Sequence, residues 1–375
     1  MCGCDKVRAA WAGEAGLNGL PPASRWLCLW FLLGWLSSPQ AILFYNTGDP
    51  AFNTNAPSGS LAGSGWQYEG RWSSFLGTAI GPHHFITAKH VGGTVGDPYY
   101  LDGVAYDTKA SFAHPQADLR IWRVGGTLPR YAELYAHTNE TGRALVIFGR
   151  GGQRGDPVTI PSLFGRPMKG WRWGKGDGVQ RWGENQVAFV MQMEDTGAEV
   201  LEMAFSGAGG ANHAGMSSGD SGGAIFIRDG ATWKLAGINW AVAGPFNTSD
   251  TGDGFNATLF DIGGLYQKSD SQWVLVPELS DKQPAPYFAT RISSYVGWIQ
   301  QILSQAIPAD PPILVSAEGL NGVYARESGV VADISNQTIR ITPSASPRFY
   351  RLQDSVPRRI ESITVQGGQL TITYR

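Results

Sequence analysis

The chain has 375 residues, of which 42% are hydrophobic and 16% charged, which excludes a largely disordered protein and allows one large or two unequal domains. A formal net charge of −2 does not favour a nucleic-acid-binding protein or one that binds anionic membranes through charge. Fifty glycines among many Thr, Val, Ile and Tyr residues favour short strands joined by tight turns, so the predicted class is all-β.

Residues 1–41 have the arrangement of a secretory leader. Arg25 precedes the apolar run 26–36, which is followed by the small and polar residues SSPQA. Eleven apolar residues are too few to span a bilayer comfortably, and a buried core helix is the alternative. Cleavage after Ala41 would leave Ile42 first. We therefore expect an exported chain, periplasmic or extracellular, with no stable membrane span after leader removal.

The positions of the cysteines help to indicate where the protein functions. All three lie in the predicted leader, and the rest of the chain has none. A disulfide framework is therefore excluded from the body. Export without cysteines is more typical of a bacterial protein than of a eukaryotic one. Four Asn-x-Ser/Thr triplets argue weakly for the opposite origin, at Asn139, Asn247, Asn256 and Asn336.

Beyond residue 60, short alternating stretches bounded by Gly, Pro, Asn or Asp predict antiparallel barrels or sandwiches. One stretch, HFITA, leads to His90. Of the six histidines, only His90 follows an apolar strand end and a small residue, Ala88, where a buried wall can fix an imidazole that moves a proton. His83 and His84 lie in a Gly-Pro turn and are expected to be solvated. No histidine pair has a convincing metal-ligand spacing, so we expect neither a metal nor an organic cofactor.

An aspartate at a strand entrance is the second candidate. Asp118 immediately precedes Leu119 and Ile121, which share one strand face, so its carboxylate can be buried beside an imidazole. Three other aspartates lie between His90 and this strand and stay open as alternatives: Asp97, Asp102 and Asp107.

The stretch GDSGG, residues 219–223, is the third and most specific signal. It places Ser221 in a glycine-bracketed turn before an apolar strand. Small neighbours let a substrate carbonyl approach the hydroxyl, and glycine lets backbone N–H groups converge on the oxyanion that forms. Most glycine-rich serine turns are only turns, but this pentapeptide indicates a nucleophile.

Separated pieces of the chain resemble the chymotrypsin-like (trypsin-type) serine endopeptidases, in the order of that family. These are FLGTAIGPHHFITAKH with His90, HPQADLRIWRV with Asp118, GDSGGAIF with Ser221, LAGINWA, and FATRISSYVGWIQQIL, which is similar to the family's closing helix. The resemblance covers about residues 60–305. It implies two antiparallel β-barrels with a C-terminal helix, and it is nearest to the compact bacterial members without disulfides.

The resemblance also implies roles for the residues. Ser221 would attack a peptide bond, His90 would accept and return the proton, and Asp118 would orient His90. The backbone N–H groups of Gly219 and Ser221 would bind the oxyanion. The implied substrate-binding residues are Gly215 at the pocket floor, Met216 beside it, and Asn239, Trp240 and Ala241 on the lining strand.

Two finer expectations follow from the same resemblance. Because Gly215 supplies no floor carboxylate, we expect apolar or small side chains before the scissile bond; Asp250 or Asp253 could supply charge from another direction. The family commonly pairs a new N-terminal amine with the residue before the nucleophile, here Asp220. Ile42 is the candidate amine, although ILFYN is not the family's usual start.

Two other functions stay open at this stage. One is a proteolytically inactive binding module that retains the fold, and the other is an esterase-like hydrolase with the same triad. Retention of His90, Ser221 and a usable aspartate argues against the inactive module. We therefore predict a serine endopeptidase that acts on proteins or peptides.

The domain organisation is predicted from composition and turn signals. Residues 42–305 form the protease domain, with a helix over 291–303; residues 306–313 form a Pro-rich linker. Within the domain, the basic, Trp-rich segment 166–185 is predicted to be a long surface loop, with nucleic-acid binding as the alternative. The long stretch between Trp240 and Phe288 is expected to hold loops or an added hairpin.

Residues 314–375 are predicted to form a small β module. Gly367 and Gly368 separate two alternating strands, as in a hairpin turn. Its mildly basic end suits docking to an envelope component or a surface polymer. A module that merely packs against the barrels is the alternative.

Overall fold

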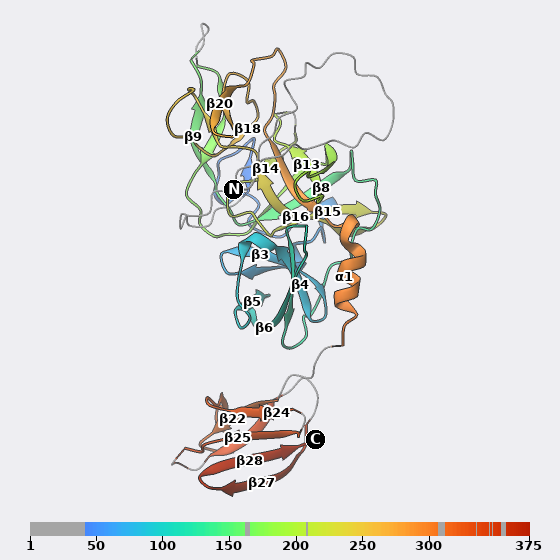
Figure 1. The fold of residues 1–375 in the computed structure, drawn as a ribbon, viewed down its shortest axis with the longest axis vertical. Helices are drawn as coiled ribbons and strands as arrows, with labels where there is room; N and C mark the ends of the chain where they lie inside the picture. The colour runs from blue at the N-terminus through green and yellow to red at the C-terminus, as the bar shows by residue number, and fades with distance from the viewer. Residues whose placement is uncertain are drawn as a thin grey trace. The chain divides into compact units, whose positions relative to one another are not determined.

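The computed structural model describes residues 42–161, 166–207, 209–306, 312–334, 336–344, 346, 348–353 and 358–375. The predicted leader, residues 1–41, lies outside the described residues. The chain divides into two compact units, a body that ends at Leu303 and a C-terminal unit that begins at Ser304 (Figure 1). Within the described residues, no helix has the length and apolar character needed to cross a membrane.

Six antiparallel strands close into a barrel in the first part of the body, which confirms one of the two predicted barrels. They are β2 (Glu69–Trp72), β3 (Phe75–Gly81), β4 (His84–Ala88), β5 (Pro98–Leu101), β6 (Val104–Ala113) and β7 (Leu119–Val124). Buried aromatic side chains from its strands form one hydrophobic cluster, with Trp72 and Trp122 packed at 4.7 Å between ring centroids. Closure of the ladder leaves this barrel without an edge strand.

His84 corrects one expectation. It is the first residue of β4 and is 3% exposed, so the prediction of a solvated His84 is wrong. The reason is that only Pro82 and His83 form the turn, and His84 already pairs with Gly81 and Arg123 in the ladder. Burial, followed by the charges of His83 and Arg123, lowers the pKa of His84 to about 4.

Seven strands form the sheet of the second part, in the order β11-β8-β15-β16-β21-β13-β12. Their bounds are β8 (Ala144–Gly149), β11 (Arg181–Gln186), β12 (Phe189–Gln192), β13 (Glu199–Ala204), β15 (Ala224–Asp229), β16 (Thr232–Val242) and β21 (Pro286–Arg291). Only Val187 and Ala188 separate the two edge strands, and Asn185 Nδ2 donates to Ala204 O at 3.0 Å. The sheet therefore curls toward a barrel, although among the described residues only the first barrel has a closed ladder.

The segment 166–185 is not the predicted surface loop, because it supplies β10 (Met168–Trp173) as well as β11. β10 pairs with β9 (Arg154–Thr159) and β18 (Ala257–Leu259). Lys169 is buried with its ammonium 2.6 Å from the Asp261 carboxylate and 3.1 Å from that of Glu278. Such pairing allows basic residues into a strand interior.

The stretch between Trp240 and Phe288 contains β17 (Phe246–Asn247), β19 (Tyr266–Ser269) and β20 (Gln272–Leu275) in one small sheet. β19 and β20 pair from Tyr266↔Leu275 to Ser269↔Gln272, so the predicted added hairpin is confirmed. Another short pair joins β1 (Leu43–Phe44) to β14 (Ala214–Gly215).

The closing helix is shorter than predicted. α1 spans Val296–Leu303 and follows a 3₁₀ turn, η5 (Ser293–Tyr295). It begins late because Arg291 still belongs to β21, where it pairs with Gly237 and its guanidinium binds the buried Glu140 carboxylate at 2.8 Å. Ile299 and Ile302 are its buried residues.

The C-terminal unit consists of two sheets, β23-β22-β26 and β24-β25-β28-β27. Their strands are β22 (Ile313–Ala317), β23 (Ala325–Arg326), β24 (Val331–Asp333), β25 (Thr338–Ile341), β26 (Phe349–Gln353), β27 (Ile360–Gln366) and β28 (Gln369–Tyr374). Gly367 and Gly368 have φ of 60° and 77°, which confirms the predicted hairpin.

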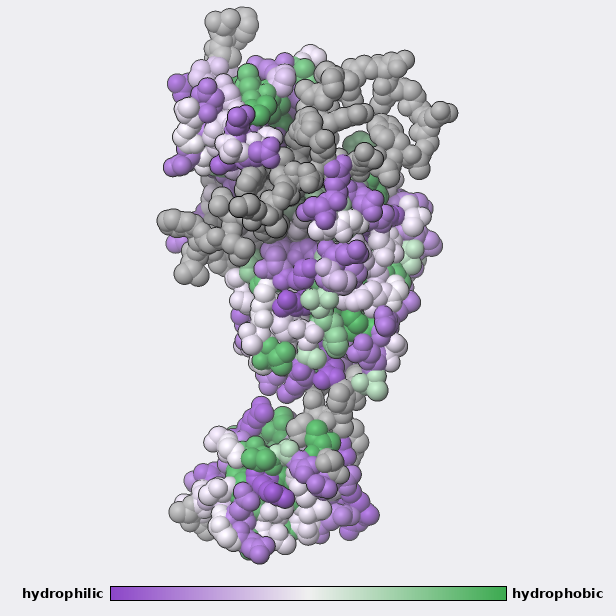
Figure 2. All heavy atoms as spheres, in the orientation of Figure 1, coloured by the Kyte–Doolittle hydropathy of each residue, from purple (hydrophilic) through white to green (hydrophobic). Residues whose placement is uncertain are grey.

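The interior of this unit is small and apolar, with Ile339 and Ile372 fully buried. Its edge strand β27 instead leaves Ile363 and Val365 more than half exposed, and Figure 2 shows hydrophobic side chains among hydrophilic ones on the visible face. Ile313, the last residue of the predicted linker, already opens β22, and residues 307–311 lie outside the described residues.

Candidate active site

His90 and Asp118 are brought together by the pairing of β4 with β7. Ala88 lies opposite Leu119 in the ladder, so the residues just beyond β4 meet the residues just before β7. His90 lies in the 3₁₀ turn η4 (Lys89–Val91), and the backbone N–H of Lys89 donates to Asp118 O at 3.2 Å. The strand register thus places an imidazole beside a carboxylate.

The carboxylate of Asp118 holds His90 at two points. Oδ2 lies 2.5 Å from His90 Nδ1, and Oδ1 accepts the backbone N–H of His90 at 2.9 Å. The side chains of His90 and Asp118 are 26% and 14% exposed. The other three aspartates point elsewhere: Asp97 accepts Thr94 N, Asp102 pairs with Arg130, and Asp107 lies in β6 opposite Pro98.

Ser221 lies in the turn between β14 and β15, and Gly222 lets this turn approach the first barrel. Gly222 has φ of 80°, and a Cβ there would lie 2.2 Å from Thr87 Oγ1 and 2.6 Å from Leu76 O. Only glycine tolerates both the backbone conformation and this approach. As a result Ser221 Oγ lies 2.8 Å from His90 Nε2.

The same turn presents backbone N–H groups beside the serine. Gly219 has φ of 90° and Gly222 donates its N–H to Asn239 O at 3.0 Å. Across the described residues, no protein acceptor is found for the N–H of Gly219 or of Ser221. Two N–H groups in one turn with the hydroxyl are the donors that an oxyanion requires.

Asp220 points the other way, into the interior, and is fully buried. Its Oδ1 accepts Gly151 N at 2.7 Å, while Oδ2 accepts Ser217 N at 2.8 Å. Among the described residues no cationic side chain forms an ion pair with it. Burial raises its pKa to about 8 despite the hydrogen bonds from Ser217 and the more distant charge of Arg181.

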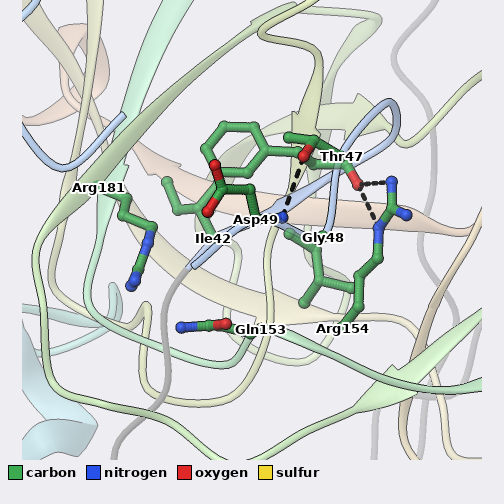
Figure 3. Close-up of a pocket in the computed structure, with 9 residues that line it drawn as sticks. Ile42, Thr47, Gly48, Asp49, Gln153, Arg154 and Arg181 are labelled. Carbon is green, nitrogen blue, oxygen red and sulfur yellow. Dashed lines mark hydrogen bonds between the residues drawn. The ribbon is translucent and has the colours of Figure 1, made fainter. Parts of the chain in front are cut away.

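The segment that begins at Ile42 is docked beside Asp220. Ile42 is 1% exposed, and a Cβ built on Gly149 would lie 2.0 Å from Asp220 Oδ1 and 2.9 Å from Ile42 Cγ1. Leu43 pairs with Gly215 in the β1–β14 ladder. Arg154 donates two hydrogen bonds to Phe44 O, at 2.9 and 2.8 Å, and lines a pocket together with Ile42 and Arg181 (Figure 3).

The predicted substrate residues have different surroundings. The side-chain amide of Asn239 donates to Phe148 O and Asp220 O, at 2.8 and 3.0 Å, so it supports the serine turn. Trp240 sits at a bulge where Asn239 and Ala241 keep their partners on β21, so Trp240 itself is left out of the register.

The predicted pocket floor is packed. Gly215 and Met216 are buried, and a Cβ on Gly215 would lie 2.7 Å from Thr258 Cγ2 and 2.9 Å from Phe205. Thr258 Oγ1 donates to Met216 O at 2.7 Å. The side chains nearest to Gly215, those of Thr258 and Phe205, are uncharged.

Sequence reasoning missed the glycines that bind Asp220 and Ser217. Gly151 donates to Asp220, and the N–H of Gly152 donates to Ser217 Oγ at 2.6 Å. The signal was the run RGG directly after the buried strand that ends at Gly149, since consecutive glycines there leave N–H groups accessible. Within the described residues no group of His, Cys, Asp or Glu side chains could hold a metal ion.

Comparisons with known proteins give the following. No family model matches the chain, and no curated protein matches it. Solved structures that align with it include neuropsin, a serine protease expressed in the limbic system of mouse brain. That similarity has a TM-score of 0.38 and 17% sequence identity, and it covers 64% of this chain and 95% of neuropsin. A likeness of this degree assigns no function.

Proposed function

We propose that the protein is a serine endopeptidase with Ser221, His90 and Asp118 as its triad. The observation that carries the proposal is the continuous chain of contacts from Asp118 Oδ2 to His90 Nδ1 at 2.5 Å and from His90 Nε2 to Ser221 Oγ at 2.8 Å. A nucleophile, a base and an orienting carboxylate in this geometry support acyl transfer.

The proposed reaction has two halves. Ser221 Oγ attacks the carbonyl carbon while its proton passes to His90 Nε2, and the oxyanion accepts the N–H groups of Gly219 and Ser221. The C–N bond then breaks, His90 protonates the leaving amine, and an acyl ester remains on Ser221. Water, deprotonated by His90, hydrolyses the ester and restores the hydroxyl. Asp118 stabilises the imidazolium of each half.

The proposal includes activation at Asp220. A buried carboxyl with a pKa near 8 is uncharged at neutral pH, and a cation placed beside it would lower that pKa. Removal of the residues before Ile42 would create an amine on a residue whose side chain packs with Asp220 around Gly149. The docking of Ile42 at that site supports this pairing, and N-terminal sequencing of the active protein tests it, because a different first residue would overturn it.

Specificity for apolar or small side chains before the scissile bond is also part of the proposal. The absence of charge at Gly215 and the cover provided by Phe205 and Thr258 favour a shallow, uncharged site. A peptide library tests this, and a clear preference for Lys or Arg would contradict it.

Two experiments separate the proposed function from its alternatives. Casein turnover should be present in the wild-type protein and lost in His90→Ala and Ser221→Ala, whereas an inactive binding module would show none. Turnover of small esters without turnover of any peptide would instead favour the esterase-like hydrolase.

Export to the periplasm or the extracellular space and docking of residues 314–375 to an envelope component or surface polymer are proposals that rest on sequence alone. Fractionation of expressing cells tests the first, and cosedimentation of the intact chain and of a chain ending at Gln305 with cell envelopes tests the second. Equal cosedimentation of the two would exclude docking through the C-terminal unit.

A further inference from the structure

His114 forms a turn that leads directly to Asp118. Its Nδ1 accepts two backbone N–H groups, from Ala117 at 2.8 Å and from Gln116 at 3.2 Å. An imidazole nitrogen accepts hydrogen bonds only when it carries no proton. The turn therefore requires the neutral tautomer of His114, with the proton on Nε2.

Hydrogen bonds tie this turn to Lys89, the residue before His90, and also close the turn on itself. The ammonium of Lys89 donates to His114 O at 3.1 Å, and the Lys89 N–H donates to Asp118 O at 3.2 Å. The N–H of His114 closes the loop on Leu119 O at 2.9 Å. A change in the turn would thus shift Asp118 relative to His90.

The hydrogen bonds that His114 Nδ1 accepts matter because Ala117 is fully buried among apolar side chains of the body. Without His114 Nδ1 its N–H would lack that acceptor away from water, which a folded chain avoids by moving the backbone. The next residue along that backbone is Asp118.

The ring of His114 is itself held by the C-terminal part of the body. Its centroid lies 4.8 Å from that of Tyr295 and 5.0 Å from that of Trp298, both in edge-on packing. Tyr295 is fixed in turn, because its hydroxyl accepts Glu199 N at 2.9 Å. The aromatic contacts fix the direction in which Nδ1 points.

We propose that His114 is a positioning residue of the triad: its neutral imidazole holds the Gln116 and Ala117 N–H groups and thereby keeps Asp118 against His90. Protonation of His114 would remove both bonds. The inference rests on the proposed function where it concerns turnover, and on the described geometry alone where it concerns the contact between His90 and Asp118.

Among the described residues, the ammonium of Lys89, bound to His114 O, and the ring of Tyr295 are the charged or titratable groups in contact with His114. Burial, then the charge of Lys89, lowers the pKa of His114 below 6.5. At neutral pH the acceptor is therefore available. Below that pKa, protonation of His114 Nδ1 would break both hydrogen bonds that hold the turn before Asp118.

Two substitutions separate the acceptor from the ring. His114→Asn places an amide oxygen where it can accept the same N–H groups, as in an Asx turn, and His114→Phe keeps the ring without the acceptor. We expect the Phe variant to lose at least about tenfold in kcat and the Asn variant to recover most of it. His137→Phe, at an exposed histidine bound to Asp229, is the matched control and should match wild type.

The pH profile is the readout that a merely structural role would not move. For wild type, the acid limb of log(kcat/KM) should steepen from a slope of one toward two, whereas His114→Asn should keep a slope of one. A slope of one in wild type, or equal activity of the Phe and Asn variants, would overturn the proposal. If the Phe variant does not fold, the slopes of the other two proteins decide.

Proton NMR of the His90–Asp118 hydrogen bond distinguishes failure of this inference from failure of the proposed function. Its downfield signal should be kept in His114→Asn and be weakened or lost in His114→Phe, even if the wild-type protein cleaves no peptide. An unchanged signal in the Phe variant would refute the positioning role, whatever the activity.

Discussion

Asp118 and Asp220 show how different surroundings suit the same type of side chain to different roles. Asp118 is partly exposed and faces an imidazole at 2.5 Å, so its charge has a partner that can become a cation. Asp220 is fully buried and meets backbone N–H groups and a hydroxyl, and its pKa is raised to about 8. Under the proposed function, Asp118 acts in catalysis as it stands, whereas Asp220 receives a new amine.

Asp118→Asn should reduce kcat more than the corresponding substitution of Asp220. An amide in place of the carboxylate no longer stabilises the imidazolium and favours the wrong tautomer of His90, so kcat should fall about 10⁴-fold at neutral pH. Because the side chain is partly exposed, the melting temperature should change little. Steady-state kinetics on a peptide substrate measure the effect, and a fall of less than tenfold would remove Asp118 from the triad.

Gly222→Ala tests the close approach of the Ser221 turn to the first barrel, on which the contact between Ser221 and His90 depends. The added Cβ meets Thr87 Oγ1 and Leu76 O and the residue must keep φ of 80°, so we expect a loss of about 1–3 kcal/mol in the free energy of unfolding. The variant should remain folded but lose most of its turnover, because Ser221 moves away from His90.

The matched control for this variant is Gly230→Ala. Gly230 also has positive φ, 62°, but has nothing within 4 Å of an added Cβ. It reports the backbone cost alone, so urea unfolding should show a smaller loss with activity kept. Equal losses of stability and activity in the two variants would contradict the close-approach role of Gly222.

Asp220→Asn examines the second aspartate through the pH dependence of stability. In the chain that retains the residues before Ile42, the folded pKa of about 8 lies above the unfolded value of 3.8. The folded state therefore holds a proton that the unfolded state releases, and stability is lost as pH rises from about 4 to about 8.

The Asn variant should lack this contribution, and the difference between wild type and variant isolates it from the buried Glu69, whose pKa is also raised to about 8. Urea unfolding across this pH range measures the difference. A difference that stays constant with pH would show that Asp220 is already ionised before any cleavage.

Truncation after Gln305 should have the smallest effect on catalysis. The triad residues all belong to the body, and the C-terminal unit has its own apolar interior. Turnover of a small peptide should stay within about twofold of the full chain, by the standard of substitutions far from the site. Complete loss in a soluble, folded truncation would place the C-terminal unit in the catalytic machinery.

Much of this arrangement was predictable from local sequence. His90 after an apolar strand, Asp118 before one, and Ser221 in GDSGG each carry a local signal, and the strand pairing then brings them together. The hairpin at Gly367 and Gly368 was predictable for the same reason, because two adjacent residues determine it.

What failed depended on partners far along the chain. Segment 166–185 looked like a basic loop because the carboxylates that neutralise Lys169 lie 92 and 109 residues away. That Asn239 contacts substrate stays a prediction, and the bonds of its amide to Phe148 and Asp220 also join parts that are distant in the sequence. His114 carried no signal, since the role proposed for it depends on backbone N–H groups that its own sequence does not reveal.

Labelling with a fluorophosphonate tests the central claim most directly. Protein processed to begin at Ile42 should gain one phosphonyl group, bound to Ser221 by peptide mapping, because His90 activates that hydroxyl. Ser221→Ala should gain none, and His90→Ala should react far more slowly. Undiminished labelling of Ser221→Ala, or an unlabelled wild-type protein, would contradict the assignment of Ser221, His90 and Asp118 as a catalytic triad.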